Sequence, residues 1–284
     1  MGGAHAVGTQ VKLGRTGLTV STLCFGTGYL SGSTAAGARL LTRAYDLGVT
    51  FWDTSDDYGT HPHVSRALRE VERDRVVVAT KTYASTAVGA QRAVAKALRE
   101  LGVEAVDIFL LHAVDSAGEL EAKLPALEAL SKAKSEGLVR AVGVSSHSRE
   151  VLTRLNVLSE VDVALVVVNQ TGAWMKDASP DEMTRAVKRL CESGRGVYGM
   201  KALGSGQVTG EKAVASALRY AFRYPYTHAI CLGITSEAEL EADVAIWHRT
   251  RKGRPRGSGK KGGPGRPPKS GAKRRGRPGT EEQG

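Results

Sequence analysis

The strongest constraint on this chain is the regular alternation of two kinds of segment along residues 19–247. Short runs of apolar and β-branched residues, typical of buried strands, are each followed by a longer segment with helical spacing. The expected strands are 19–26, 50–54, 76–80, 106–112, 140–145, 163–169, 197–202 and 229–233. The expected helices are 34–47, 62–71, 86–101, 119–136, 148–158, 180–193, 211–222 and 236–247. Such strict alternation predicts a parallel sheet covered by helices.

The number of strand–helix units favours a closed barrel over an open doubly wound sheet. An open dinucleotide-binding sheet carries a G-x-G-x-x-G turn after its first strand. Here Gly26 and Gly28 supply the first two glycines, and the third is absent. A repeating body of roughly 240 residues suits a (β/α)8 TIM barrel, which typically needs about 250. We therefore expect an α/β fold of this kind, preceded by a short hairpin over residues 10–20.

The last 36 residues differ from the body in composition. Residues 249–284 hold 13 of the 40 Lys and Arg residues but 2 of the 29 Asp and Glu residues, so they carry the whole formal net charge of +11. Gly, Pro, Lys and Arg dominate there, and a segment with almost no apolar residues cannot offset its ordering entropy. We expect a flexible N-terminus over 1–9, a barrel over 10–248 and a disordered tail over 249–284.

The tail also repeats a short basic motif. A Gly-Arg-Pro core with basic flanks stands in each of the segments 252–257, 265–269 and 274–279. These segments resemble AT-hooks, in which an extended Arg-Pro core enters the narrow minor groove of DNA. A generic polycationic extension is the alternative. Either interpretation predicts weak, salt-sensitive binding of nucleic acid through residues 252–279.

Targeting signals and cysteine spacing restrict the class of protein further. No apolar stretch approaches the ~20 residues of a membrane helix. The first residues lack the basic start and apolar run of a signal peptide. We expect a soluble cytoplasmic protein that does not bind membranes. The three cysteines, Cys24, Cys191 and Cys231, are odd in number and lack C-x-x-C spacing, so we expect buried thiols and no metal site.

Ionisable residues follow three consecutive expected strands at the end where barrel enzymes place their active sites. Asp53 ends the second strand and leads to Tyr58, Lys81 ends the third strand, and His112 ends the fourth. Singly, each could be a surface aromatic, a structural histidine or half of an ordinary ion pair. Together, on one rim, they predict a catalytic group.

The segments around these residues resemble the aldo-keto reductase family. The matching segments are 51–59 (FWDTSDDYG), 79–82 (ATKT), 107–112 (DIFLLH) and 140–146 (RAVGVSS). They occur in the order that the family has, and the resemblance extends over roughly residues 10–247. It implies an oxidoreductase that reduces a small-molecule aldehyde or ketone to an alcohol with NAD(P)H.

The resemblance also assigns a role to each of the four residues. Tyr58 is the general acid in reduction. Lys81 is expected to lower the pKa of Tyr58, because a neighbouring ammonium favours the phenolate. Asp53 holds Lys81 in place and keeps it charged, and His112 orients the carbonyl. The hydride comes from a nicotinamide, since no side chain can supply one.

Further positions are implied for binding the cofactor. The nicotinamide amide is expected at Ser145, Ser146, Asn169 and Gln170. Met200 is expected against the nicotinamide ring, Leu203, Gly204, Ser205 and Gly206 at the pyrophosphate, and Ser236 and Glu239 near the adenosine ribose. The family favours NADP(H), whose 2′-phosphate wants Arg or Lys. Residues 233–243 contain none, and Glu239 suits the free ribose hydroxyl of NAD(H), so both cofactors remain open.

Two classes of function follow. The first is an NAD(P)H-dependent reductase with an incidental basic tail. The alternative is a nucleic-acid-associated protein whose barrel binds nicotinamide as a redox sensor. The four residues on the rim favour the first, and the tail keeps the second open.

Overall fold

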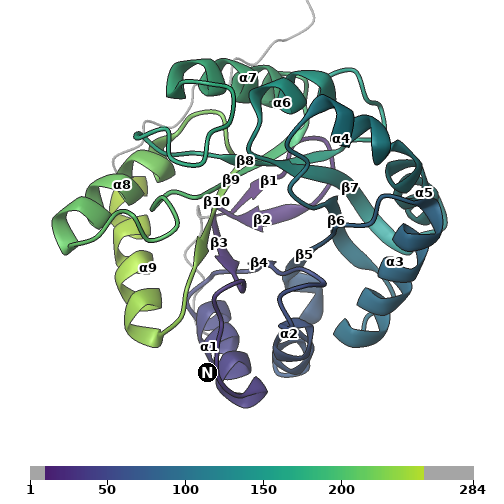
Figure 1. The fold of residues 1–284 in the computed structure, drawn as a ribbon. Coiled ribbons are helices and arrows are strands. Elements are labelled where there is room, and N and C mark those ends of the chain that lie inside the picture. The colour runs from purple at the N-terminus through teal and green to yellow at the C-terminus, as the bar shows by residue number, and fades with distance from the viewer. Residues whose placement is uncertain (1–9, 253–284) are drawn as a thin grey trace, which may run out of the picture. The chain divides into compact units, whose positions relative to one another are not determined.

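In a computed structural model of the protein, which describes residues 10–252, eight parallel strands close into a barrel (Figure 1). In order around the barrel these are β3 (Leu23–Gly26), β4 (Phe51–Asp53), β5 (Val77–Thr82), β6 (Val106–Leu111), β7 (Val139–Ser146), β8 (Val163–Val167), β9 (Gly196–Met200) and β10 (Ala229–Gly233). Strand β10 pairs with β3 and so completes the ring. The expected TIM barrel is confirmed.

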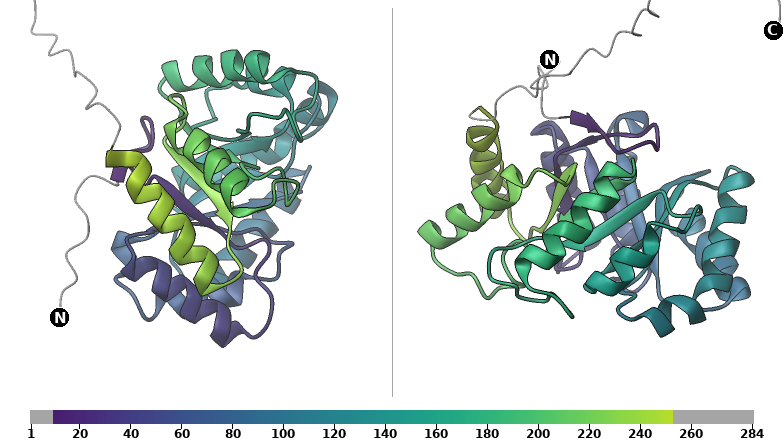
Figure 2. Two further views of the ribbon diagram at one scale, coloured as in Figure 1. Left: turned by 90° about the vertical axis from the view of Figure 1, so that its left-hand side faces the viewer. Right: turned by 90° about the horizontal axis from the view of Figure 1, so that it is seen from above.

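Helices surround the barrel on its outer side (Figures 1 and 2). They are α1 (Thr34–Asp46), α2 (His61–Leu68), α3 (Ala87–Leu101), α4 (Ala117–Ala122), α5 (Leu124–Ser135), α6 (Arg149–Leu155), α7 (Pro180–Glu192), α8 (Glu211–Arg223) and α9 (Glu237–Lys252), with a 3-10 helix at Arg73–Arg75. The main core lies between the helices and the outward-facing strand residues, such as Phe25 and Val144. Helix α3 ends at Gly102, whose φ of 68° is the left-handed conformation that glycine adopts most readily.

An antiparallel hairpin closes one end of the barrel. Strands β1 (Gln10–Lys12) and β2 (Thr19–Ser21) form the expected hairpin. Its residues Leu13 and Val20 are buried with the inward-facing side chains of the barrel strands. A Cβ at Gly196, where β9 begins, would lie 2.7 Å from Leu13, so the glycine permits this close contact. The hairpin therefore seals the N-terminal end, which leaves the carboxyl ends of the strands for a site.

The expected strand over 19–26 is two strands, because the chain bends at Thr22. The hydroxyl of Ser21 donates to the carbonyl of Leu23 at 2.6 Å and accepts from the backbone N–H of Thr50 at 3.0 Å. The Ser21 side chain thus bonds to backbone groups that would pair with backbone groups in a continuous strand. The first half therefore belongs to the hairpin and the second to the barrel.

Two expected helices also differ from those observed. The segment 119–136 forms α4 and α5 with a junction at Lys123, because Pro125 has no N–H and its ring clashes with the preceding turn. Helix α9 continues to Lys252, beyond the expected end at 247 and into the segment expected to be disordered. Its last turn is held by burial of Trp247 and Thr250. The remaining tail, 253–284, and residues 1–9 lie outside the described residues.

None of the helices within residues 10–252 is both long and apolar enough to cross a bilayer.

Candidate active site

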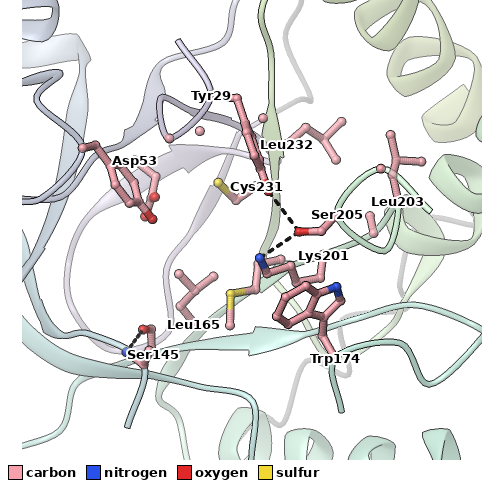
Figure 3. A pocket seen from close by; sticks show the side chains of 18 of the residues that line it. Tyr29, Asp53, Ser145, Leu165, Trp174, Lys201, Leu203, Ser205, Cys231 and Leu232 are labelled. Carbon is pink, nitrogen blue, oxygen red and sulfur yellow. Dashed lines mark hydrogen bonds between the residues drawn. The ribbon is translucent and has the colours of Figure 1, made fainter. Parts of the chain in front are cut away.

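A cavity of about 660 Å3 opens at the carboxyl ends of the barrel strands (Figure 3). Its size is within the range of small-molecule sites, which is about 300–1,000 Å3. Asp53, Tyr58, Lys81 and His112 all line it, so the structure brings the four expected catalytic residues together.

Asp53 and Lys81 form a buried ion pair at the base of this cavity. The Lys81 Nζ donates to Asp53 Oδ1 and to the carbonyl of Thr54, both at 2.6 Å. The second oxygen of Asp53 accepts a hydrogen bond of 2.8 Å from the hydroxyl of Tyr198, a residue that we did not expect in the site. Burial alone would lower the pKa of Lys81, but the Asp53 carboxylate raises it above its ordinary value. Lys81 is therefore charged at neutral pH.

Tyr58 lies beside this ion pair with its ring toward the ammonium. The Lys81 Nζ is 4.8 Å from the centroid of the Tyr58 ring. Burial raises the pKa of Tyr58 well above its ordinary value, and Lys81 opposes that increase without overcoming it. Lys81 therefore acts in the expected direction, but burial outweighs it and the net pKa of Tyr58 is raised. The phenol keeps its proton at neutral pH, which is the form that a general acid needs.

His112 lies within hydrogen-bond reach of the Tyr58 hydroxyl. Its Nε2 lies 3.5 Å from that hydroxyl, and its Nδ1 lies 3.1 Å from the Ser55 hydroxyl. Tyr83 stacks on the imidazole with the ring centroids 4.4 Å apart. Burial and then the charge of Lys81 lower the pKa of His112 to about 3. The ring is therefore neutral and acts through hydrogen bonds.

The residues expected at the cofactor divide into two groups. Six of them line the cavity: Ser145, Met200, Leu203, Ser205, Gly206 and Glu239. Five do not: Ser146, Asn169, Gln170, Gly204 and Ser236.

The contacts and exposure of three residues outside the cavity explain why they do not line it. The hydroxyl of Ser146 is fully buried and accepts from the backbone N–H of Ser148 at 3.0 Å. The amide group of Asn169 donates to the carbonyl of Ala173 at 2.9 Å, while its oxygen accepts from loop N–H groups. Gln170 is exposed. Of the four residues expected to bind the nicotinamide amide, Ser145 is therefore the one that lines the cavity.

His147 lines the cavity one position beyond the two serines, and its ring is held by Asp115. The Nδ1 atom lies 3.1 Å from both carboxylate oxygens, and the backbone N–H of His147 donates to the same carboxylate at 2.8 Å. Burial would raise the pKa of Asp115, but hydrogen bonds from His147 and Lys176 lower it to about 2. The carboxylate is therefore ionised, and Nδ1 carries the proton. The Nε2 atom is buried and has no hydrogen-bond partner within residues 10–252.

The loop after β9 is connected across the cavity to the loop after β3. The Ser205 hydroxyl lies 3.0 Å from the Tyr29 hydroxyl and accepts from the Lys201 Nζ at 2.9 Å (Figure 3). Ser205 adopts a φ of 57°, which is uncommon for a residue with a side chain. Lys201 also lies 4.5 Å from the Trp174 ring centroid. This bridge brings a positive charge to the expected pyrophosphate loop.

A carboxylate stands at the start of α9. Glu239 accepts hydrogen bonds from the backbone N–H and the hydroxyl of Thr235, at 2.8 and 2.7 Å. The nearby Arg43 from α1 is paired with Glu237 and, at 2.7 Å, with Glu241. The edge of the cavity at Glu239 is therefore acidic.

Comparisons with known proteins identify the family of this chain and agree with its fold. The model of the aldo/keto reductase family matches residues 22–216. A probable aldo-keto reductase 1 from Glycine max is 27% identical over an alignment of 225 residues, and the match covers 72% of this chain and 62% of that protein. This chain thus spans less than two thirds of the length of that relative.

Solved structures of aldo-keto reductases have a similar fold. A putative aldo-keto reductase from Pseudomonas aeruginosa has a TM-score of 0.74 and 26% identity, and the match covers 87% of this chain and 96% of that one. The holo form of an aldo-keto reductase from Bacillus halodurans has a TM-score of 0.72 over 86% of this chain and 95% of that one, at 19% identity, and so supports the fold alone. On the family match, the chain belongs to the aldo-keto reductase family.

Proposed function

We propose that this protein reduces an aldehyde or ketone to an alcohol with NAD(P)H, and that Tyr58 is the general acid. The observation that carries the proposal is the buried group at one end of the cavity. A protonated phenol, Tyr58, lies between a fixed ammonium, Lys81, and a neutral imidazole, His112. This combination can donate a proton and stabilise the anion that remains.

The cavity offers groups that fit a nicotinamide amide. The Ser145 hydroxyl accepts from the backbone N–H of Ala113 at 2.8 Å, which leaves its own proton for a carbonyl oxygen. The His147 ring lines the same cavity, and its Nε2 is buried without a partner in the described chain, so a small movement of the cavity wall would let it accept from an amide N–H. A primary amide presents one acceptor and one donor side. We therefore propose that Ser145 and His147 bind it, in place of the larger set expected from the sequence.

The proton transfer depends on residues that the chain itself supplies. A bound reduced nicotinamide supplies the hydride. The carbonyl oxygen accepts hydrogen bonds from Tyr58 and His112, and as the carbon is reduced this oxygen becomes basic enough to take the Tyr58 proton. The phenolate left behind lies against Lys81, whose charge stabilises it without reorganisation. Asp53 fixes the position of Lys81.

The rim of the cavity favours an apolar or aromatic carbonyl compound. Tyr29, Tyr83 and Trp174 line the cavity, and each is about half exposed, at 58%, 50% and 49%. Large apolar surface that remains open to solvent commonly marks a binding site. We propose aromatic aldehydes as a preferred class of substrate.

The acidic edge at Glu239 favours NAD(H) over NADP(H). A carboxylate repels a 2′-phosphate but accepts hydrogen bonds from a free ribose hydroxyl. The family habit points the other way, and the Ser236 hydroxyl at the start of α9 could receive a phosphate. Competition between NADH and NADPH for the purified protein measures the preference.

The test of the proposed function is consumption of NADH and NADPH with a panel of aromatic and aliphatic aldehydes. We expect turnover with wild type, and a loss of about 100-fold or more with Tyr58→Phe, because general acid catalysis contributes about that much. Tyr220→Phe, on α8 outside the cavity, is the matched control and should retain wild-type turnover. Equal turnover of the Tyr58→Phe and wild-type proteins would remove Tyr58 as the acid.

A second candidate function rests on the tail, and it is carried by the three Gly-Arg-Pro cores in residues 252–279. These residues lie almost wholly outside those that the structure describes. A protein truncated after Lys252 should lose retention on AT-rich DNA at low salt and should keep carbonyl reduction. Equal retention of the full-length and truncated proteins would exclude the tail as a nucleic-acid-binding segment.

A further inference from the structure

Two of the three cysteines lie side by side on adjacent strands beneath the cavity. Cys24 of β3 and Cys231 of β10 are direct partners in the register of this parallel pair. Both belong to the interior of the barrel, whereas their neighbours Leu23 and Phe25 pack outward against the helices. The two thiols therefore lie near each other, and Cys231 contributes to raising the pKa of Cys24.

The two thiols differ in accessibility. Cys231 is half-buried and lines the cavity (Figure 3), whereas Cys24 is fully buried. A Cβ at Gly26 would lie 2.9 Å from the Cys231 Sγ, so the absence of a side chain at Gly26 leaves room for this sulfur. Burial, and then the contact with Cys231, raise the pKa of the Cys24 thiol. A small solute in the cavity therefore reaches Cys231 first.

We propose that Cys231 and Cys24 form a dithiol that small hydroperoxides oxidise to a disulfide. The Cys231 sulfur attacks the O–O bond and takes one oxygen, which gives a sulfenic acid and releases water or an alcohol. The Cys24 sulfur then attacks the Cys231 sulfur. The S–S bond forms, the S–O bond breaks, and the hydroxide leaves as water with the thiol proton. The two cysteines lose two electrons, and the peroxide gains them.

The register permits this bond with little movement of the backbone. Neighbouring strands lie about 4.8 Å apart, which is within the roughly 4.4–6.8 Å between Cα atoms that a disulfide spans. Side chains of parallel partners point the same way rather than toward each other, so the bond would carry strain. Strained disulfides are the more easily reduced ones. The oxidised form is therefore expected to be reversible.

The disulfide would form next to the proposed catalytic group. Cys231 is near enough to Tyr58 and Lys81 to interact electrostatically with both. Gly26, two residues after Cys24, pairs with Asp53 in the neighbouring strand. A disulfide between β3 and β10 would displace the strand residues next to Asp53 and Lys81. We therefore expect oxidation to lower the proposed reductase activity.

The remaining cysteine provides a matched control. Cys191 of α7 is half-buried like Cys231 but packs against the helix layer and does not line the cavity. Burial raises the pKa of the Cys191 thiol. A general sensitivity of thiols to peroxide would affect Cys191, whereas the proposed site would not involve it.

The experiment treats the full-length protein with one equivalent of hydrogen peroxide, alkylates the free thiols and maps the peptides by mass spectrometry. We expect a Cys24–Cys231 cross-linked peptide that has lost two hydrogens, that dithiothreitol reverses, and that leaves Cys191 alkylated. In Cys24→Ala, Cys231 should stop at sulfenic acid with one equivalent of peroxide and proceed to sulfinic acid when a second equivalent is added. In Cys231→Ser, peroxide should oxidise Cys24 at least ~10-fold more slowly than it does in the wild-type protein, because burial limits access to the Cys24 thiol.

Two results would overturn the proposal. One is a wild-type protein in which Cys231 is oxidised to sulfenic acid, or to sulfinic acid with further peroxide, while Cys24 stays free, and the other is oxidation of Cys191 before Cys231. The wild-type map decides the matter even if Cys24→Ala fails to fold. The peptide map reports no catalysis, so failure of the proposed reductase function would be seen separately.

Discussion

The hydroxyl of Tyr198 on β9 donates a 2.8 Å hydrogen bond to Oδ2 of Asp53 on β4, across the interior of the barrel. Because Lys81 takes the other oxygen of the same carboxylate at 2.6 Å, both oxygens of Asp53 are held. The ammonium that faces Tyr58 is thus fixed from two sides of the barrel. Tyr198 is a positioning residue, since it reaches the cavity only through Asp53.

Tyr198→Phe tests this positioning. The substitution keeps the buried ring and removes one hydrogen bond to a charged group, which should destabilise the fold by about 1.5–3 kcal/mol. We expect kcat to fall several-fold and KM for the carbonyl compound to change little. Chemical denaturation and steady-state kinetics measure the two effects. A variant with lower stability but unchanged kcat would limit Tyr198 to a structural role.

The pH dependence should differ between the two directions of reaction. Because burial raises the pKa of Tyr58 and lowers that of His112 to about 3, neither group titrates between about pH 6 and 9. Reduction needs the phenol and should stay constant over that range. Oxidation of the alcohol needs the phenolate and should rise about tenfold for each pH unit. A limb near pH 6.5 in reduction, as for an ordinary histidine, would contradict this assignment.

His147→Ala should weaken binding of the reduced cofactor by about 2- to 10-fold, the effect of one hydrogen bond. Asp115→Ala should act in the same direction, because the ring loses the carboxylate that holds Nδ1. Gln170→Ala is the control, since Gln170 is exposed and does not line the cavity. Titration by protein fluorescence gives the three dissociation constants. If Gln170→Ala has the largest effect, the nicotinamide amide binds at Gln170, as the sequence predicted, and the proposed role of His147 is wrong.

Glu239→Gln should shift the cofactor preference toward NADPH. The substitution removes a negative charge from the edge of the cavity while it keeps an oxygen that Thr235 can donate to. We expect the ratio of NADPH to NADH affinity to rise by about 2- to 5-fold, the effect of one partly screened charge. Glu241→Gln, whose side chain pairs with Arg43, is the matched control and should leave the ratio unchanged. Equal shifts in both variants would place the ribose elsewhere.

The end of α9 sets where the tail can be removed. Truncation after Lys252 should leave the stability unchanged, whereas truncation after residue 248 removes Thr250, which is buried and donates to the carbonyl of Ile246 at 2.8 Å. We expect the shorter protein to lose about 1–2 kcal/mol, the cost of one buried side chain and its turn. Thermal unfolding of the two proteins makes the comparison.

The barrel and its four rim residues could be predicted because both depend on local patterns. Apolar runs and helical spacing repeat along the chain, and Asp53, Lys81 and His112 stand at or next to strand ends. The predicted boundaries of helices and strands were wrong where a single residue interrupts an otherwise regular pattern. Pro125 divides one expected helix, and the Ser21 hydroxyl replaces strand hydrogen bonds.

The missed site residues depend on contacts between distant parts of the chain. Tyr198 reads as an ordinary inward-facing residue, and its partner Asp53 is 145 positions away. His147 and Asp115 gave a weaker signal: each follows one of two adjacent strands, β6 and β7, on the rim where the site was expected. The pKa of Tyr58 could not be predicted, because the depth of burial that outweighs Lys81 is set by the packed barrel.

The most direct test of the account is a fluorescence titration of the purified protein with NADH and, separately, with NADPH. We expect saturable binding of at least one of them, the same binding within a factor of about three in Tyr58→Phe, and turnover of an aromatic aldehyde only when Tyr58 is present. That result would establish a nicotinamide site that serves this acid. Failure of the wild-type protein to bind either cofactor would contradict the account, however well the four residues are arranged.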